Sequence, residues 1–235
     1  MSEPVIVIDN GSGYIKSGLS NKDKPSIMIP NLIGHAYDGF TENIGNIKLK
    51  KIMIGEETTP VKFLLKLTYP MIDGSIINEE DMSIIWDYCI KKKLGIYGNY
   101  KNRKILLTES PCNSMDNKKK MAEILFEKLE FGYFNVEPQA KASLFAGGET
   151  TGIVLDSGED ATYIVPIFEG SLMQNHIKNI KIGGRHITEY LIKLLQFKGY
   201  SLNSSFDFES VREMKEKHCF VSIDIDSDRR LERET

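Results

Sequence analysis

The chain has 235 residues, of which 41% are hydrophobic and 27% are charged, and it carries a formal net charge of -3. A chain of this size can bury a substantial core, and its nearly balanced charge gives no electrostatic reason to expect nucleic acid as a partner. No apolar run approaches the ~20 residues that a membrane-spanning helix needs, and the N-terminus has no signal-peptide pattern. Three scattered cysteines favour reduced thiols over disulfides or a zinc site. These features predict a soluble protein of the cytoplasm.

The N-terminal part of the chain is predicted to be rich in strands. β-Branched residues and glycine turns indicate a strand, a turn and a second strand within residues 5–20, and a third strand at 26–29. Residues 31–68 differ in character, because they contain several glycines and a segment of mixed charge. They are expected to form a small inserted lobe with a mobile loop.

Helices are predicted from residue 78 onward. Asn78 precedes a run of acidic residues and then apolar residues at helical spacing, which is the pattern of a capped helix. The charged segment 224–235 lacks apolar periodicity and is expected to be a linker or a frayed edge. Strands at the start of each half, followed by helices, predict two α/β lobes of related plan. Further helices are predicted at 114–129, 138–146, 187–195 and 208–218, and a short buried strand at 105–108.

One sequence phrase occurs twice, at residues 5–13 and 152–158. Each copy is a hydrophobic strand that ends in an aspartate, Asp9 or Asp156, and continues into a turn with glycine and serine. Glycine lets backbone N–H groups approach an anion closely, and a carboxylate at the strand end can face a metal ion. One copy alone is more often a structural turn. Two copies, each resuming as strand after the turn, predict a pair of hairpins that clamp a polyphosphate.

The order of motifs along the chain resembles that of actin and actin-related proteins. The resemblance runs from Val5 to about Ile225. The segments that carry it are Asp9-Asn10-Gly11-Ser12-Gly13 with Lys16, Leu106-Leu107-Thr108-Glu109-Ser110-Pro111, Thr151-Gly152-Ile153-Val154-Leu155-Asp156-Ser157-Gly158, Gly183-Gly184-Arg185, and Val211-Arg212-Glu213-Met214-Lys215-Glu216-Lys217.

This resemblance implies the α/β fold of the actin-like ATPases, a ribonuclease H-like fold in which two lobes surround a nucleotide cleft. On that basis, residues 1–148 are expected to form the first lobe, with 31–68 as its inserted subdomain. Residues 149–235 are expected to form part of the second lobe. The family fold continues through segments that this sequence does not contain, so the second lobe is expected to be incomplete.

The resemblance also implies cofactors, partners and a location. ATP or ADP is expected in the cleft, with Mg²⁺ or Ca²⁺ on its phosphates. Actin and the subunits of an actin-related protein complex are the implied partners, with neither nucleic acid nor a membrane span. The implied location is the cytoplasm and its cytoskeleton, where the protein would act in actin nucleation.

Individual site residues follow from the same resemblance. Asp9 and Asp156 are expected beside the metal ion, through water molecules, because magnesium keeps several waters. Gln139 is expected to orient the water that attacks ATP. The residues expected to contact the nucleotide are Gly11, Ser12, Gly13 and Lys16 in the first turn, Asp156, Gly158, Glu159 and Asp160 in the second turn, and Gly184, Arg212, Lys215 and Glu216 around the nucleoside.

The second turn departs from the family pattern at two positions. Asp160 stands where the family has glycine, and Tyr163 stands where it often has histidine. A carboxylate ~4 Å from phosphate repels it by about 4 kcal/mol at an effective dielectric constant of ~20, which would weaken nucleotide binding. Alternatively, Asp160 points into solvent and has no such effect. Tyr163 in place of a histidine beside the attacking water predicts slow or absent hydrolysis.

Three functions are compatible with these residues. The first is an ATP-binding cytoskeletal protein in which the nucleotide acts as a conformational lock. The second is a degenerate, actin-like interaction module without effective nucleotide binding, which Asp160, Tyr163 and the missing segments favour. The third is an ATPase of the same superfold, such as a sugar kinase or a chaperone. The segment at 212–217 argues against it, because that segment is characteristic of actins.

Overall fold

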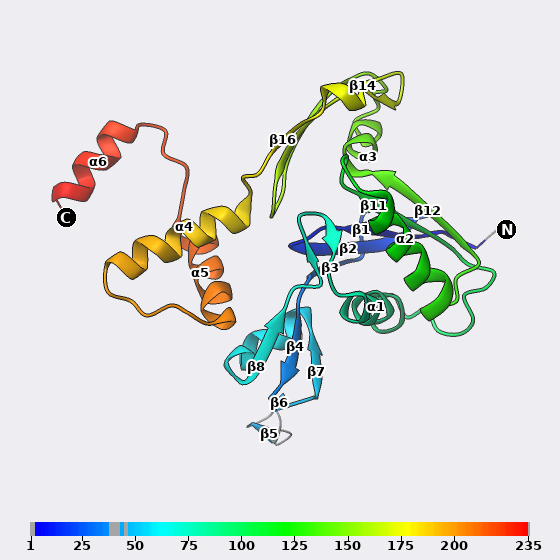
Figure 1. Cartoon of the computed structure of the whole chain (residues 1–235), viewed down its shortest axis with the longest axis horizontal. Helices are drawn as coiled ribbons and strands as arrows, with labels where there is room; N and C mark the ends of the chain where they lie inside the picture. Colours follow the sequence, from blue (N-terminus) through cyan, green and yellow to red (C-terminus); the bar gives the residue numbers. More distant parts are fainter. Residues whose placement is uncertain (1–2, 38–42, 45–46, 235) are drawn as a thin grey trace. The chain divides into compact units, whose positions relative to one another are not determined.

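The computed structural model describes residues 3–37, 43–44 and 47–234 (Figure 1). The chain divides into two compact units, Met1–Ile187 and Thr188–Thr235. The lobe boundary expected after residue 148 falls within the first unit and stays a prediction. The mobile loop expected in the inserted lobe stays a prediction, and residues 38–42 and 45–46 of that lobe lie outside the described residues. Strands and helices are both abundant, which confirms the predicted α/β class.

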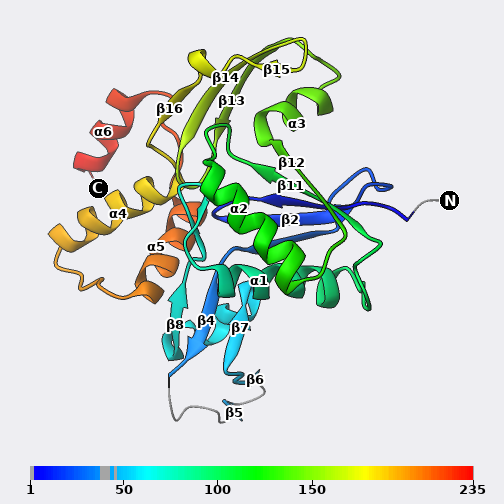
Figure 2. The same ribbon diagram turned by 45° about the vertical axis from the view of Figure 1, so that its right-hand side comes forward.

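A five-stranded sheet forms the centre of the first unit (Figure 2). Its order is β12-β11-β1-β2-β3, with β1, β11 and β12 parallel and β1, β2 and β3 antiparallel. The side chains of Ile6 and Ile8 are fully buried, because alternate residues of β1 point into the core. The strands are β1 (Ile6–Asn10), β2 (Tyr14–Leu19), β3 (Ile27–Pro30), β11 (Lys104–Glu109) and β12 (Tyr133–Pro138).

Two helices pack against this sheet through one apolar cluster, which includes Trp86 and Met121. Helix α1 (Glu79–Asp87) continues into the π-helical turn η2 (Tyr88–Lys93), and α2 (Met115–Glu123) continues into η3 (Ile124–Lys128). The cap predicted at Asn78 is confirmed, because its side chain accepts a hydrogen bond from the Asp81 backbone N–H. Ser114 caps α2 in the same way.

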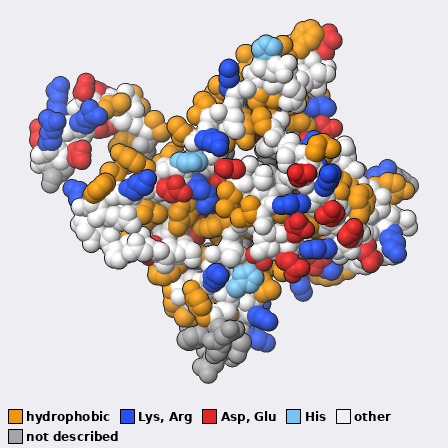
Figure 3. Space-filling model, viewed as in Figure 1, with side chains coloured by type: hydrophobic (Ala, Val, Ile, Leu, Met, Phe, Trp, Pro, Cys, Tyr) orange, Lys and Arg blue, Asp and Glu red, His pale blue; other side chains and the backbone are white. Residues whose placement is uncertain are grey.

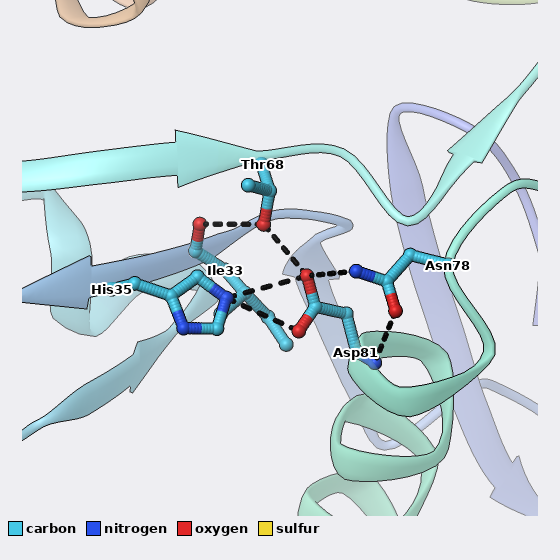
Figure 4. Close-up of polar contacts among 5 residues, drawn as sticks. All are labelled: Ile33, His35, Thr68, Asn78 and Asp81. Carbon is cyan, nitrogen blue, oxygen red and sulfur yellow. Dashed lines mark hydrogen bonds and ion pairs between the residues drawn. The ribbon is translucent and has the colours of Figure 1, made fainter.

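The inserted lobe has its own three-stranded sheet, in the order β7-β4-β8. A buried carboxylate, that of Asp81 in α1, joins this sheet to the rest of the unit (Figure 4). Its oxygens lie 3.1 and 3.3 Å from His35 Nε2, and Thr68 Oγ1 donates to it at 2.8 Å. The elements of this lobe are β4 (Ile33–Ala36), β5 (Asn43–Ile44), β6 (Ile47–Lys48), β7 (Ile52–Ile54), the 3₁₀ segment η1 (Gly55–Leu64) and β8 (Leu65–Thr68).

A second sheet carries the repeated hairpin. Strand β14 lies between β13 on one side and β15 and β16 on the other, and helix α3 packs on this sheet through Ala140. The other face of β13 is bare, because Ile153 and Leu155 are 73% and 67% exposed. The elements of this sheet and its surroundings are α3 (Gln139–Ala146), β13 (Gly152–Ser157), β14 (Thr162–Phe168), β15 (Ser171–Leu172), the 3₁₀ turn η4 (Gln174–His176) and β16 (Lys178–Ile180). A separate small hairpin consists of β9 (Met71–Ile72) and β10 (Ser75–Ile76).

Three helices complete the chain: α4 (Gly184–Phe197), which begins in the first unit, α5 (Ser205–His218) and α6 (Ile225–Glu234). Helix α5 starts with a capping box formed by Ser204 and Asp207. The linker or frayed edge expected at 224–235 is wrong, because α6 occupies this segment. Asp224 accepts hydrogen bonds from the backbone N–H groups of the first turn, and Arg233 lies in the last turn, where it complements the helix dipole.

The lysine-rich helix surfaces are electrically balanced. Acidic and basic side chains are interspersed over α1 and α2 (Figure 3). Ion pairs on these surfaces include Lys91–Asp87, Lys93–Glu56, Lys118–Glu109, Lys119–Asp116 and Lys128–Glu80. Within the described part of the chain, no helix is both long and apolar enough to cross a membrane.

Candidate functional site

The first aspartate, Asp9, is held by three donors. Thr108 Oγ1 donates to its Oδ1 at 2.6 Å, Gln139 Nε2 to the same oxygen at 3.1 Å, and Lys16 Nζ to Oδ2 at 3.3 Å. The fold explains why Thr108 and Gln139 lie beside Asp9, because β1, β11 and β12 are parallel and their carboxyl ends lie at one edge of the sheet. Thr108 is near the end of β11, and Gln139 follows the last residue of β12. Lys16 is the cross-strand partner of Asp9 on β2.

The first turn is fixed by a residue that the sequence analysis missed. Asn31, directly after β3, donates from Nδ2 to the carbonyl of Gly11 and from its backbone N–H to the carbonyl of Gly13, both at 2.9 Å. Asn31 is 1% exposed. A side chain at Gly11 would place Cβ 2.6 Å from the Tyr14 carbonyl oxygen, so only glycine fits there. The one signal in the sequence was an asparagine at the end of an apolar strand.

The two repeated turns face each other. A Cβ atom on Gly13 would lie 3.0 Å from the Cβ of Glu159, so the turns approach closely. Burial and then the charge of Asp9 raise the pKa of the Asp156 carboxyl, while Lys16 lowers it. The carboxylates of Asp9 and Asp156 therefore interact electrostatically across the space between the turns. The close approach of the two turns is as expected from the sequence, and their role as a polyphosphate clamp stays a prediction.

A cavity of about 780 Å³ lies between the hairpins. Among the residues that line it are Asp9, Gly11, Ser12, Gly13, Lys16, Gln139, Asp156, Gly158, Glu159, Asp160 and Tyr163. Gly184, which was expected in the nucleoside pocket, does not line this cavity. Its backbone N–H instead donates to the carbonyl of Gly158 at 3.0 Å, behind the second turn.

Asp160 does not point into solvent, so that alternative is wrong: the residue is only 4% exposed. Its Oδ1 accepts a hydrogen bond from Arg185 Nε at 2.8 Å, and its Oδ2 accepts one from the backbone N–H of Asp73 at 2.7 Å. The negative charge is therefore matched by a neighbouring positive charge. This ion pair removes most of the repulsion of phosphate that an unpaired carboxylate would cause.

Arg185 is held from several sides. Its guanidinium lies 4.7 Å from the centre of the Tyr69 ring, and its backbone N–H donates to the Glu159 carbonyl at 2.8 Å. Burial opposes its ionisation, but the hydrogen bond and charge of Asp160 outweigh burial and raise the pKa of Arg185. Gly183 permits this close approach, because a Cβ there would lie 2.5 Å from the Glu159 carbonyl oxygen.

Tyr163 lies beside the second aspartate, as its cross-strand partner on β14. Burial raises the pKa of Tyr163 above its ordinary value of 10.0, although a hydrogen bond with Ser110 lowers it. The phenol therefore remains protonated at neutral pH. It cannot take a proton from water as a neutral imidazole would.

The remaining nucleoside residues belong to the second compact unit, so their role stays a prediction. Arg212 is paired with Glu209 within α5, at 2.8 Å, and both side chains are at least nine-tenths buried. Glu216 lies 4.0 Å from Arg212 on the same helix.

The metal ion expected from the sequence would be held by two carboxylates, those of Asp9 and Asp156. Across the described ranges, no group of three or more His, Cys, Asp or Glu side chains is arranged to hold a metal ion. Asp9 and Asp156 both line the cavity, and their mutual repulsion favours a cation between them. Oxygen ligands suit Mg²⁺, which would complete its coordination with phosphate and water.

Comparison with known proteins gives a consistent result. The family model described as "Actin" matches residues 1–234. Actin-related protein 2 of Schizosaccharomyces pombe is 42% identical over 235 residues, that of Acanthamoeba castellanii 39% over 234, and that of Caenorhabditis briggsae 40% over 232. These alignments cover 98–100% of this chain and 58–60% of each relative. The chain thus spans less than two thirds of the length of these relatives.

Three short segments resemble actin-related protein 2 in particular. They are Gly45-Asn46-Ile47-Lys48 with Ile52-Met53-Ile54-Gly55, then Trp86-Asp87-Tyr88, and then Asp207-Phe208-Glu209-Ser210-Val211-Arg212. This subtype expectation agrees with the named relatives.

Proposed function

The chain belongs to the actin family, and we propose that it is an ATP-binding cytoskeletal protein of the actin-related protein 2 type, with its nucleotide between the two hairpins. One observation carries the proposal above all others. Asp9, fixed by Thr108, Gln139 and Lys16, shares the cavity with Asp156 of the facing hairpin.

The chemistry of the cavity suits a polyphosphate with a divalent cation. Gly11 and Gly13 line the cavity without side chains of their own, and the Lys16 ammonium adds a positive charge beside the cavity. The bound cation would neutralise the paired carboxylates and the phosphate charge. Asp9 and Asp156 would hold it, through water where Mg²⁺ keeps its hydration shell.

Gln139 would position water at the phosphates. Its Nε2 donates to Asp9, so its amide oxygen is the atom that can accept a hydrogen bond from water. Tyr163 stays protonated and supplies no general base. We therefore propose that turnover is slow and that ATP acts mainly as a conformational ligand.

The partners proposed are actin and the other subunits of an Arp2/3-type complex, in the cytoplasmic cytoskeleton. The relatives named actin-related protein 2 support this part of the proposal. A sugar kinase or a chaperone ATPase is the main enzymatic alternative, but the matched family model is that of actin and the relatives named above are actin-related protein 2. The alternative of a degenerate interaction module without nucleotide binding is weakened, because the negative charge of Asp160 is paired with Arg185.

Calorimetric titration with ATP in magnesium buffer tests the proposal. Lys16→Gln removes the ammonium beside the cavity and is expected to weaken ATP binding by about tenfold, the effect of one charged hydrogen bond. Lys119→Gln is the matched control, because this lysine is 68% exposed on α2, and it should bind ATP normally. Absence of ATP binding by the unmodified chain, alone and with its natural partners, would refute the proposal.

A further inference from the structure

Asp160 makes two contacts that point in different directions. Its side chain is 4% exposed, and each of its carboxylate oxygens accepts a hydrogen bond. One donor is the Arg185 side chain, at the start of α4. The other is the backbone N–H of Asp73, 87 residues earlier in the sequence. Each carboxylate oxygen of Asp160 is thus engaged by a protein donor, and the two donors come from different segments of the chain.

The Asp73 contact reaches a well-anchored turn. Asp73 and Gly74 connect β9 to β10, and both have positive φ angles, 52° and 72°. Asn117 of α2 holds the hairpin, because its Nδ2 donates to the Gly74 carbonyl at 3.2 Å and its Oδ1 accepts from the Ile76 N–H at 2.8 Å. Asp160 therefore ties the second turn to a segment that is fixed on α2.

The positive charge of Arg185 offsets the free-energy cost of burying the Asp160 carboxylate. An unpaired carboxylate at this depth would carry a large desolvation cost. The Arg185 side chain is 14% exposed, and its guanidinium packs over the ring of Tyr69, which precedes the β9–β10 hairpin in sequence. The ion pair thus draws together the second turn, the start of α4 and the segment that leads into β9.

We propose that Asp160 is a positioning residue whose carboxylate, paired with Arg185, fastens the second turn to the Asp73–Gly74 turn and so sets the width of the nucleotide cleft before any ligand binds. The effect on the nucleotide rests on the proposed function; the fastening itself does not. Glycine at position 160 would remove the contact as well as the charge. It is therefore expected to weaken ATP retention, whereas a simple electrostatic obstacle would give the opposite sign.

Hydrogen exchange of the Asp73 amide in the nucleotide-free chain tests the fastening. Asp160→Gly is expected to accelerate this exchange about tenfold, because the amide loses its acceptor. Asp160→Asn keeps one acceptor oxygen and should restore part of the protection. Asp81→Asn is the matched control, since Asp81 is equally buried at 3% but contacts the inserted lobe instead. Unchanged Asp73 exchange in Asp160→Gly, or an equal acceleration in Asp81→Asn, would overturn the proposal.

The rate of ATP dissociation, followed by displacement of a fluorescent ATP analogue, tests the consequence for the cleft. Asp160→Gly should release the analogue about tenfold faster, with Asp160→Asn between it and the unmodified chain. Slower release from Asp160→Gly would overturn the positioning role. If the unmodified chain retains no analogue, the proposed function fails, and Asp73 exchange still decides whether the fastening exists.

The pairing with Arg185 has a test of its own. Arg185→Gln leaves the buried carboxylate without its cation, whereas the double variant Asp160→Asn, Arg185→Gln leaves a neutral pair. The single variant is expected to melt at the lower temperature. Equal or reversed melting temperatures would show that the ion pair does not support the contact.

Discussion

The two hairpins share a sequence phrase but stand in different surroundings. Ile8 and Leu155 each precede the aspartate of their hairpin, yet Ile8 is fully buried and Leu155 is 67% exposed. The first hairpin lies inside a five-stranded sheet covered by α1 and α2. The second lies at the edge of a smaller sheet with one bare face. Equal local sequence therefore does not give equal support, because burial depends on what the rest of the fold places around each strand.

The polar support of the two aspartates differs as well. Asp9 accepts hydrogen bonds from three side chains that come from separate elements. Asp156 is half-buried, and its pKa is raised by that burial and by Asp9. The first hairpin thus has side-chain donors on its aspartate, whereas the second turn has the buried ion pair of Asp160 with Arg185. Substitutions at matched positions of the two hairpins separate these two forms of support.

Truncation of the matched apolar residues should show the largest difference. Ile8→Ala opens a cavity in a packed core and is expected to lower the free energy of unfolding by about 2–5 kcal/mol. Leu155→Ala removes an exposed side chain and should change it by no more than about 0.5 kcal/mol. Chemical denaturation of both variants measures the difference. Similar losses in the two variants would mean that the bare face of β13 is covered in solution.

Removal of one polar side chain beside each turn, Asn31 for the first and Thr162 for the second, should give a smaller contrast. Asn31→Ala leaves the Gly11 carbonyl without its donor in a buried place, and it is expected to cost about 1–3 kcal/mol and to weaken ATP binding. Thr162→Val removes a hydrogen bond to the Ile182 carbonyl at an exposed position, and should cost less than about 1 kcal/mol. Denaturation and calorimetry on the same preparations give both quantities. A larger loss from Thr162→Val would reverse the ranking of the two hairpins.

The pH dependence of stability should distinguish the aspartates most finely. The folded chain binds the Asp156 proton more tightly than the unfolded chain, so ionisation costs stability as pH rises from the ordinary pKa of 3.8 through the raised pKa. Asp156→Asn removes this cost and is expected to stabilise the nucleotide-free chain at neutral pH. Its advantage should shrink as pH falls toward 3.8 and disappear below it. Thermal unfolding without metal or nucleotide measures this, and an advantage independent of pH would contradict the assignment.

Much of the local structure could be predicted from the sequence. The Asn78 cap, the β1–β2 and β13–β14 hairpins, and helices α3 and α5 follow from capping residues, glycine turns and apolar spacing, all of which act over a few residues. Helix α6 was missed because its apolar residues are few. Asp224 accepts hydrogen bonds at its N-terminus, and Asp226, Asp228 and Arg233 complement its dipole.

The site divides in the same way. The sequence by itself determined the family, the two turns and the aspartates at the strand ends, because these are properties of contiguous segments. Only the tertiary structure decided that Asn31 fixes the first turn, that Thr108 and Gln139 hold Asp9, and that Asp160 is paired with Arg185. These contacts join residues that lie between 20 and 130 positions apart. No local pattern records them, since each one depends on strand order and packing, which bring distant side chains to the same cavity.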